Sequence, residues 1–297
     1  MGLGAYLYFK AERLPINEGM LFLKIHEYSW ESQDRIRFQA KSWFAESQPK
    51  ATVFLVHGLG EHLGRYEHVA CLFAENGYDI FAFDLRGHGQ SGGKRGHTPS
   101  YGRLLDDIGD FITHSDVRES GLRFLYGHSL GGNLALHYHI RKQAIFSGLV
   151  ITSPLLRTAQ PVSAFLWNAG LVLNKIWPSL TIDNKIDEKY ITRDPEMLNK
   201  RRNDPLRHDK LSFGLGIEMI AAGEWLLTNA GEISIPMLLM HGSADQVTSP
   251  QASVELCKKT GAACTFKLWE GHYHEMQNDV GREKVLDFIV DWLNSKT

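Results

Sequence analysis

The sequence has few cysteines and no excess of charge of either sign. Its 297 residues include three cysteines, Cys71, Cys257 and Cys264, and none of them is in a C-x-x-C pair. Lys and Arg number 32 against 34 Asp and Glu, and the charges are scattered along the chain. These absences speak against a disulfide framework, a zinc site and a nucleic-acid partner, and they favour a reducing compartment.

Targeting and membrane-spanning signals are also absent. The first ten residues, MGLGAYLYFK, lack the basic region and the long apolar stretch of a signal peptide. No N-x-S/T sequon occurs. The longest charge-free run, 158–174, contains Pro161 and Gly170 and falls short of the ~18 clean apolar residues of a spanning helix. We therefore expect a soluble, cytoplasmic chain.

Buried strands that alternate with helices are the main pattern present. After a hairpin at 20–28 and 35–44, apolar runs of strand length alternate with amphipathic stretches. The expected strands cover 51–58, 78–84, 122–127, 147–153, 235–242 and 264–270, and the expected helices cover 66–75, 103–114, 130–138, 250–260 and 282–294. Continuous apolar strands joined by helices predict an α/β fold with a mostly parallel, doubly wound sheet.

The alternation stops for almost eighty residues in the second half of the chain. It ends after residue 153 and resumes near residue 232, which indicates an insertion between two core strands. An insertion at the carboxyl end of such a sheet would cover the crevice where ligands bind. We therefore predict an α/β core of 1–153 and 232–297 with a helical cap of 154–231.

A candidate nucleophile lies between the third core strand and its helix. The segment LRFLYGHSLGGN, 122–133, reads as strand, tight turn and helix, with Ser129 at the apex of a G-x-S-x-G pattern. Two residues on either side of such a serine, the chain passes so close that a side chain would clash, which explains glycine at positions 127 and 131. If the turn is a nucleophile elbow, Ser129 needs a base, a carboxylate and an oxyanion site elsewhere in the chain.

A carboxylate and two histidines follow later strands. Asp245 comes directly after the strand at 235–242, and His272 and His274 follow the last strand. Serine, aspartate, histidine is the order of the α/β-hydrolase fold. The residues alone leave both histidines open as the base, and H-x-H could also hold a metal, although no third ligand with suitable spacing is nearby.

Two glycine-rich segments follow the first two core strands. HGLGEH, 57–62, can donate a backbone N–H from Leu59 to an oxyanion, and the N–H of Leu130 would be the second donor. The segment 83–97 is glycine-rich and basic, but it matches neither nucleotide-binding pattern. We therefore predict no cofactor and no metal.

Seven motifs in a fixed order resemble the monoacylglycerol lipases and the related bacterial lysophospholipase-like serine hydrolases. They are HGLGEHLGRY (57–66), FDLRGHGQSGG (83–93), GHSLGG (127–132), SPLL (153–156), NDPL (203–206), HGSAD (241–245) and EGHYHE (270–275). The resemblance covers the chain from about residue 20 onward. It implies that Ser129 is the nucleophile, Asp245 the acid and His274, rather than His272, the base.

The same resemblance points to residues that contact substrate. Glu61 and Arg65 match positions beside the family's small polar pocket for glycerol. Two positions depart from the pattern of animal members: Gln277 replaces a histidine, and Arg201 replaces a tyrosine of the cap. These two departures put in question how the chain would recognise the alcohol part of the ester.

The cap contains a helix that is apolar on almost every side. Phe165 and Leu166 belong to an apolar stretch, 162–173, and a helix of this kind is buried or meets lipid. We expect Phe165 and Leu166 to contact a lipid-like acyl group, and the same helix could touch a membrane surface. The alternative is ordinary packing against the core.

The predicted function is hydrolysis of a small lipid ester, with monoacylglycerol as the leading substrate. Lysophospholipase, carboxylesterase and acyl thioesterase are alternatives on the same catalytic residues. A binding protein on a catalytically silent hydrolase fold is the alternative from a different class.

Overall fold

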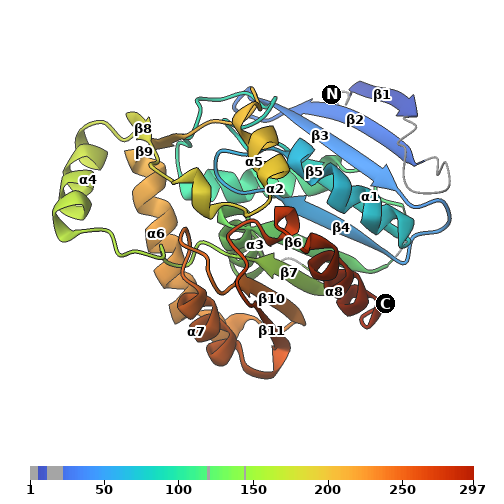
Figure 1. The fold of residues 1–297 in the computed structure, drawn as a ribbon. Coiled ribbons are helices and arrows are strands. Elements are labelled where there is room, and N and C mark those ends of the chain that lie inside the picture. The colour runs from blue at the N-terminus through green and yellow to red at the C-terminus, as the bar shows by residue number, and fades with distance from the viewer. Residues whose placement is uncertain (1–5, 12–22, 119–120, 144) are drawn as a thin grey trace.

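One nine-stranded sheet runs through the molecule (Figure 1). The computed structural model describes residues 6–11, 23–118, 121–143 and 145–297. The strands are β1 (Tyr6–Ala11), β2 (Lys24–Glu31), β3 (Arg37–Phe44), β4 (Ala51–Val56), β5 (Tyr78–Phe83), β6 (Arg123–His128), β7 (Gly148–Thr152), β10 (Met237–Gly242) and β11 (Cys264–Trp269). Their order across the sheet is β1-β2-β3-β5-β4-β6-β7-β10-β11.

The sheet is antiparallel at one end and parallel over the rest. Strands β1, β2, β3 and β5 pair antiparallel, whereas β5, β4, β6, β7, β10 and β11 pair parallel. The mostly parallel α/β fold predicted from the sequence is confirmed. The expected hairpin is β2 and β3, but β1 lies outside β2, and the first residues of that hairpin, 20–22, lie outside the described residues.

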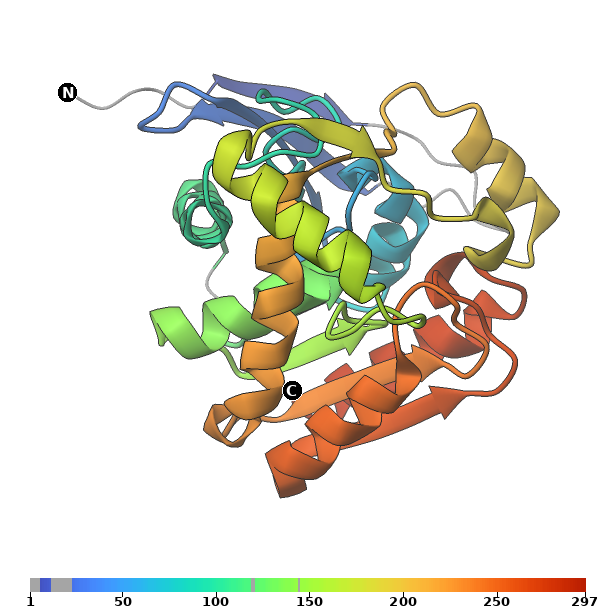
Figure 2. The ribbon, with the colours of Figure 1, turned by 90° about the vertical axis from the view of Figure 1, so that its left-hand side faces the viewer.

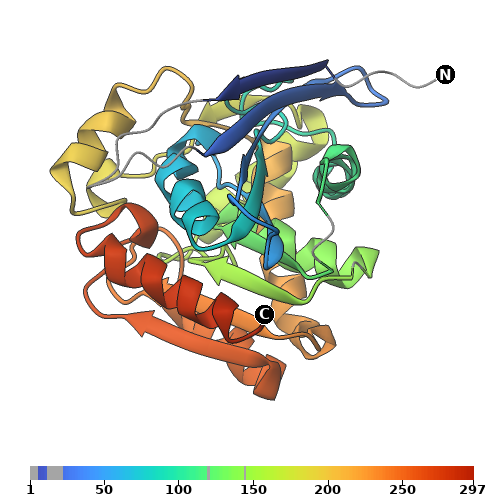
Figure 3. The same ribbon diagram turned by 90° about the vertical axis from the view of Figure 1, so that its right-hand side faces the viewer.

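Helices cover both faces of the sheet. Helices α1 (Glu67–Glu75) and α8 (Arg282–Asn294) cover one face (Figure 3) and share one hydrophobic core with it. Helices α2 (Tyr101–His114), α3 (Leu130–Lys142) and α7 (Pro250–Thr260) contribute to the core on the opposite face. Because both faces are covered, every residue of β4, β5, β7 and β10 is buried, which accounts for their mostly apolar sequences.

The residues between β7 and β10 add no strand to the large sheet, and we call 154–231 the cap segment. It contains α4 (Ala164–Ile176), β8 (Thr181–Asp183), α5 (Pro195–Arg202), β9 (Lys210–Ser212) and α6 (Phe213–Thr228), with β8 and β9 paired to each other. Short 3-10 turns cover Leu63–Tyr66, Glu188–Tyr190, Ala230–Glu232, Gly261–Ala263 and Met276–Asn278. Helix α6 packs on α3, and α4 crosses α6 on the outside (Figure 2).

Helix α4 is exposed instead of buried. Phe165 is 80% exposed and Leu166 63% exposed, and Gly170 alone is buried among the residues of this helix. Helix α4 packs mainly on α6, and most of its apolar side chains stay exposed. Within the residues that the structure describes, no helix has the length and the apolar character needed to cross a bilayer.

The cysteines differ from the expectation. Cys257, near the end of α7, and Cys264, the first residue of β11, form a disulfide with a Cα–Cα distance of 5.5 Å. The turn between α7 and β11 brings the two residues together, and a spacing of seven residues does not reveal this in the sequence. Cys71 is a free, buried cysteine. The cysteine pattern therefore no longer supports a reducing compartment.

Candidate active site

Ser129 lies on a sharp turn between β6 and α3. Its backbone has φ 54° and ψ −117°, a conformation that costs free energy for a residue with a side chain. The turn is held by the Ser129 N–H, which donates to the Thr152 carbonyl at 3.0 Å, and by the Ser129 carbonyl, which accepts from Leu155. Strain of this kind persists where the surroundings impose it, and here it directs the hydroxyl away from the sheet.

The two glycines around Ser129 lie where the backbone has no room for a side chain. A Cβ on Gly127 would lie 2.4 Å from the Gly131 carbonyl oxygen. A Cβ on Gly131 would lie 2.0 Å from the Val56 carbonyl oxygen at the end of β4. The close approach of the backbone therefore requires glycine at both positions, as expected from the sequence.

Three side chains from separate loops form a continuous hydrogen-bonded chain. His274 Nε2 lies 3.0 Å from Ser129 Oγ, and His274 Nδ1 lies 2.7 Å from Asp245 Oδ2. Ser129 follows β6, Asp245 follows β10 and His274 follows β11. These strands are parallel, so their carboxyl ends meet at one edge of the sheet, and residues distant in sequence converge there.

Asp245 is a fully buried carboxylate with five donors. Its Oδ1 accepts from the N–H groups of Val247 and Thr248, and its Oδ2 accepts from Thr248 Oγ1, His241 and His274. Burial opposes the charge, but the two imidazoles outweigh burial and hold the pKa of Asp245 well below its usual range. Burial also disfavours the charged imidazole of His274, yet the Asp245 carboxylate raises the pKa of His274 above 6.5.

His272 is not brought to Ser129. Its Nδ1 lies 3.5 Å from Asp279 Oδ2, on the other side of the loop. The structure thus distinguishes His274, which lies beside Ser129, from His272, although the residue pattern alone left both open as the base. In the described part of the chain, no group of three or more His, Cys, Asp or Glu side chains could hold a metal ion.

The two backbone groups expected to bind an oxyanion lie next to Ser129 in the chain or in space. Leu130 is the first residue of α3, so its N–H has no acceptor within the helix. Leu59 follows Gly58, where a Cβ would lie 3.1 Å from the Cβ of Ser129. The loop that contains Leu59 therefore passes beside the serine. The oxyanion role of the two N–H groups stays a prediction.

Ser129 and His274 open into a cavity of about 430 Å³ between core and cap segment. Apolar side chains form much of its wall, among them Leu155, Ile191, Leu211, Met219, Ile220 and Val247. Glu61, Glu275 and Arg201 supply a charged part of the wall. The cavity thus offers an ester both an apolar and a polar environment.

Three of the residues expected to contact substrate do not line this cavity. Phe165 and Leu166 project from the exposed α4, because α6 covers only one side of that helix. Arg65 lies behind the cavity wall: its guanidinium contacts Glu275 Oε2 at 2.5 Å and Glu61 Oε2 at 3.5 Å. Its position indicates that it holds the two carboxylates that do line the cavity.

Glu275 is a residue that the sequence analysis did not single out. It is buried beside His274 and contacts Arg65 and, at 3.6 Å, Arg201. Burial works against its charge, but the two arginines lower the pKa of Glu275 to about 2. Its place immediately after His274, at the end of the EGHYHE motif, was the signal in the sequence. Gln277 is also fully buried, and it is absent from the cavity wall.

Comparisons with known proteins cover nearly the whole described chain. A family model described as serine aminopeptidase, S33, matches residues 47–281. The monoacylglycerol lipase of Mycolicibacterium smegmatis is 31% identical over 272 residues, which are 91% of this chain and 97% of that protein. An abhydrolase domain-containing protein of Dictyostelium discoideum is 39% identical over 268 residues, and this chain spans 28% of its length.

A solved structure agrees with these sequence similarities. The monoacylglycerol lipase of Paleococcus ferrophilus has a TM-score of 0.80 against this chain at 35% identity, covering 88% of this chain and 99% of the other. The range matched by the family model, 47–281, includes the cap segment as well as the parallel part of the sheet.

Proposed function

This chain belongs to the monoacylglycerol lipase-like family of α/β-hydrolases and is a carboxylic ester hydrolase, and from this premise we propose that it cleaves monoacylglycerol through an acyl-enzyme on Ser129. The resemblance drawn from the seven motifs is confirmed at the level of the family. The substrate and the covalent mechanism are the proposal.

The observation that carries the proposal is the chain of hydrogen bonds from Asp245 to Ser129. His274 Nδ1 lies 2.7 Å from the ionised Asp245, so the ring proton belongs on Nδ1. The other nitrogen, Nε2, is then an acceptor 3.0 Å from the Ser129 hydroxyl. This is the arrangement in which an imidazole removes a proton from a serine as the serine attacks.

The reaction proceeds by two displacements. Ser129 Oγ bonds to the ester carbonyl carbon while His274 takes the hydroxyl proton, and the N–H groups of Leu59 and Leu130 bind the oxyanion. The carbon–oxygen bond to glycerol breaks, and His274 returns the proton to the leaving oxygen. Water then attacks the acyl-enzyme with His274 again as base, which releases the fatty acid and restores Ser129.

The wall of the cavity supports an amphiphilic substrate. Apolar side chains such as Leu155 and Met219 suit an acyl chain, since burying apolar surface stabilises the complex. Glu61 and Arg201 can accept from and donate to hydroxyl groups of an alcohol. The relatives from Mycolicibacterium smegmatis and Paleococcus ferrophilus are monoacylglycerol lipases by name, which supports the same substrate class.

The exposed apolar helix α4 supports contact with a membrane surface as part of this proposal. Phe165, Leu166, Val172, Ile176 and Trp177 are all more than half exposed. Large exposed apolar side chains gathered on one element are typical of surfaces that meet lipid or another protein. A lipid ester would then enter the cavity from the interface.

Hydrolysis of a series of substrates tests the proposal. We would measure kcat/KM for 1-monoacylglycerols of increasing acyl length and for p-nitrophenyl esters of the same acids, with Ser129→Ala as the blank. The proposal expects turnover that rises from short to medium or long acyl chains. Turnover of short p-nitrophenyl esters without any turnover of monoacylglycerols would contradict it and favour a general carboxylesterase.

A further inference from the structure

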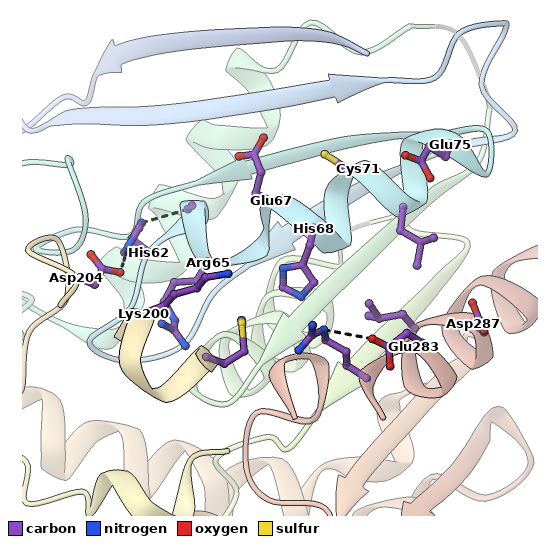
Figure 4. A pocket seen from close by; sticks show the side chains of 15 residues that line it. His62, Arg65, Glu67, His68, Cys71, Glu75, Lys200, Asp204, Glu283 and Asp287 are labelled. Carbon is purple, nitrogen blue, oxygen red and sulfur yellow. Dashed lines mark hydrogen bonds and ion pairs between the residues drawn. The ribbon is translucent and has the colours of Figure 1, made fainter. Parts of the chain in front are cut away.

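The loop that contains Leu59 contacts the cap segment at two points. We call residues 57–62 the oxyanion loop. The carbonyl of Gly60 accepts a hydrogen bond from the backbone N–H of His208 at 3.0 Å. Two residues further along, His62 Nε2 lies 2.7 Å from Asp204 Oδ2. Figure 4 shows Asp204 facing His62 at one end of a groove of about 820 Å³ between α1, α5 and α8.

The hydrogen-bond partners of His62 determine which of its nitrogens carries the proton. The N–H of Gly64 donates to His62 Nδ1 at 3.2 Å, so Nδ1 is an acceptor. The neutral ring then carries its proton on Nε2 and donates it to Asp204. The bond therefore needs an acceptor oxygen at position 204.

Asp204 uses its two carboxylate oxygens for different tasks. Oδ1 accepts from the backbone N–H of Leu206 at 3.0 Å and holds the turn that follows α5. Oδ2 accepts from His62 and joins that turn to the oxyanion loop. Burial opposes the charge of Asp204, but the bond from His62 outweighs it and lowers the pKa of Asp204. The carboxylate is thus an ion at neutral pH, which strengthens the bond.

At the contact between Gly60 and His208, the backbones of the oxyanion loop and the cap segment are closely packed. Gly60 has φ +75°, and a Cβ on it would lie 2.3 Å from the carbonyl oxygen of His208. The two backbones therefore touch directly beside Leu59. A shift of the turn at 204–208 would move the oxyanion loop, because close-packed backbones transmit displacement.

We propose that Asp204 is a positioning residue for ester hydrolysis, which holds the oxyanion loop through His62 so that the Leu59 N–H faces the ester carbonyl oxygen. The inference rests on the proposed function of Ser129 and Leu59. Asp204 does not line the cavity that contains Ser129, so its effect passes through the loop and not through contact with substrate. The cap segment then completes the oxyanion site as well as covering the cavity.

Asp204→Asn tests this role with little change in shape. Asparagine has one acceptor oxygen in place of two, so it cannot accept from both His62 and the Leu206 N–H. Either loss breaks the link between the turn at 204–206 and the oxyanion loop, and we expect kcat on a soluble p-nitrophenyl ester to fall about tenfold while KM stays within about twofold. A general loss of folded protein would instead lower the amount of active enzyme, which titration of active sites detects. An unchanged kcat, or a raised KM with kcat intact, would overturn the proposal.

Arg282→Gln is the matched control. Arg282 joins the core to the cap segment through Asp194 at 2.7 Å, as Asp204 does through His62, but it does not contact the oxyanion loop. We expect this variant to keep the kcat of the wild type. If both variants lose kcat equally, attachment of the cap segment in general is responsible, and the specific role of Asp204 is wrong.

A double-mutant cycle with His62→Ala shows whether Asp204 acts through His62. His62→Ala alone should reproduce the fall in kcat, and adding Asp204→Asn should lower kcat no further. Independent, multiplicative losses would contradict the proposed path. Should Asp204→Asn fail to fold, His62→Ala still tests the same bond from its other end.

The rate of labelling by a fluorophosphonate separates this inference from the proposed function. Ser129 Oγ bonds to phosphorus while His274 takes the hydroxyl proton, fluoride leaves, and the phosphoryl oxygen occupies the oxyanion site. Absence of labelling in the wild type would reject the hydrolytic function itself. Labelling of the wild type and of Asp204→Asn at the same rate would reject the positioning role alone.

Discussion

At the scale of single residues, the candidate site is built around the buried Asp245 carboxylate. This carboxylate binds His274 Nδ1 and leaves His274 Nε2 to accept from Ser129. Asp245 is fully buried and accepts from backbone, hydroxyl and imidazole groups, so His274 is fixed in orientation as well as in tautomer. The positive φ of Ser129 places its hydroxyl within 3.0 Å of that imidazole. These contacts fix the relative positions of the Asp245 carboxylate, the His274 ring and the Ser129 hydroxyl.

Removal of the nucleophile should abolish turnover. We expect Ser129→Ala to lower kcat by about six orders of magnitude and Asp245→Ala by about four, by analogy with other serine triads. Hydrolysis of a p-nitrophenyl ester measures both. Ser295→Ala, at the end of α8 and remote from Ser129, is the control and should keep full activity. A Ser129→Ala enzyme that retained most of its turnover would refute the mechanism.

The pH dependence should report the environment of His274. The base must be neutral, and the Asp245 carboxylate raises the pKa of His274 above 6.5, so kcat/KM should be lost as pH falls through a value above 6.5. Asp245→Asn removes the negative charge, which lowers the pKa of His274. Its acid limb should move to lower pH while the maximal rate falls, and a shift to higher pH would contradict this assignment.

At the scale of elements, the ends of parallel strands do most of the positioning. β6, β10 and β11 each end in a loop that carries one residue of the hydrogen-bonded chain, and β4 ends in the oxyanion loop. The backbones of β4 and α3 come into close contact at Gly131. The site therefore depends on how tightly these elements pack.

Gly131→Ala should separate β4 from α3. Its Cβ would lie 2.0 Å from the Val56 carbonyl oxygen, and relief of that overlap should cost about 1–3 kcal/mol of unfolding free energy together with most of the activity. Urea denaturation and ester hydrolysis measure the two effects. Gly231→Ala, whose Cβ would meet nothing within 4 Å, is the matched control. Equal behaviour of the two variants would show that the close approach is unimportant.

At the scale of the whole molecule, the cap segment has one face toward the cavity and another toward the surroundings. Met219 and Ile220 of α6 line the cavity, whereas α4 turns Phe165 and Leu166 outward. The same insertion can therefore shape the site and present an apolar surface.

Phe165→Ser with Leu166→Ser should weaken binding to vesicles of zwitterionic phosphatidylcholine. Burial of a large apolar side chain contributes about 1.5–3 kcal/mol, which is about tenfold or more in partitioning for each residue, so the double variant should partition at least about a hundredfold less. Sedimentation with vesicles measures this, and hydrolysis of a soluble ester should be unchanged. Ile145→Ser, at a residue 94% exposed outside the cap segment, is the control. Equal partitioning of all variants would exclude α4 as the contact.

Features that repeat along the chain could be predicted, and features that join distant segments could not. The apolar runs of β4, β5, β6 and β10 reveal their burial because periodicity is local. The bond between Cys257 and Cys264 depends on a turn, and the outward placement of Phe165 depends on which neighbours α4 finds. Neither has a local signature.

The sequence by itself determined the α/β fold and the motif that places Ser129 on a turn, because both follow from spacing along the chain. The residue pattern left His272 and His274 open and the family resemblance favoured His274, which the tertiary structure brings to Ser129. Only the tertiary structure decided that Arg65 lies behind Glu61 and Glu275 and that Asp204 is bonded to His62. Those contacts join residues up to 210 positions apart, and packing alone brings such residues together.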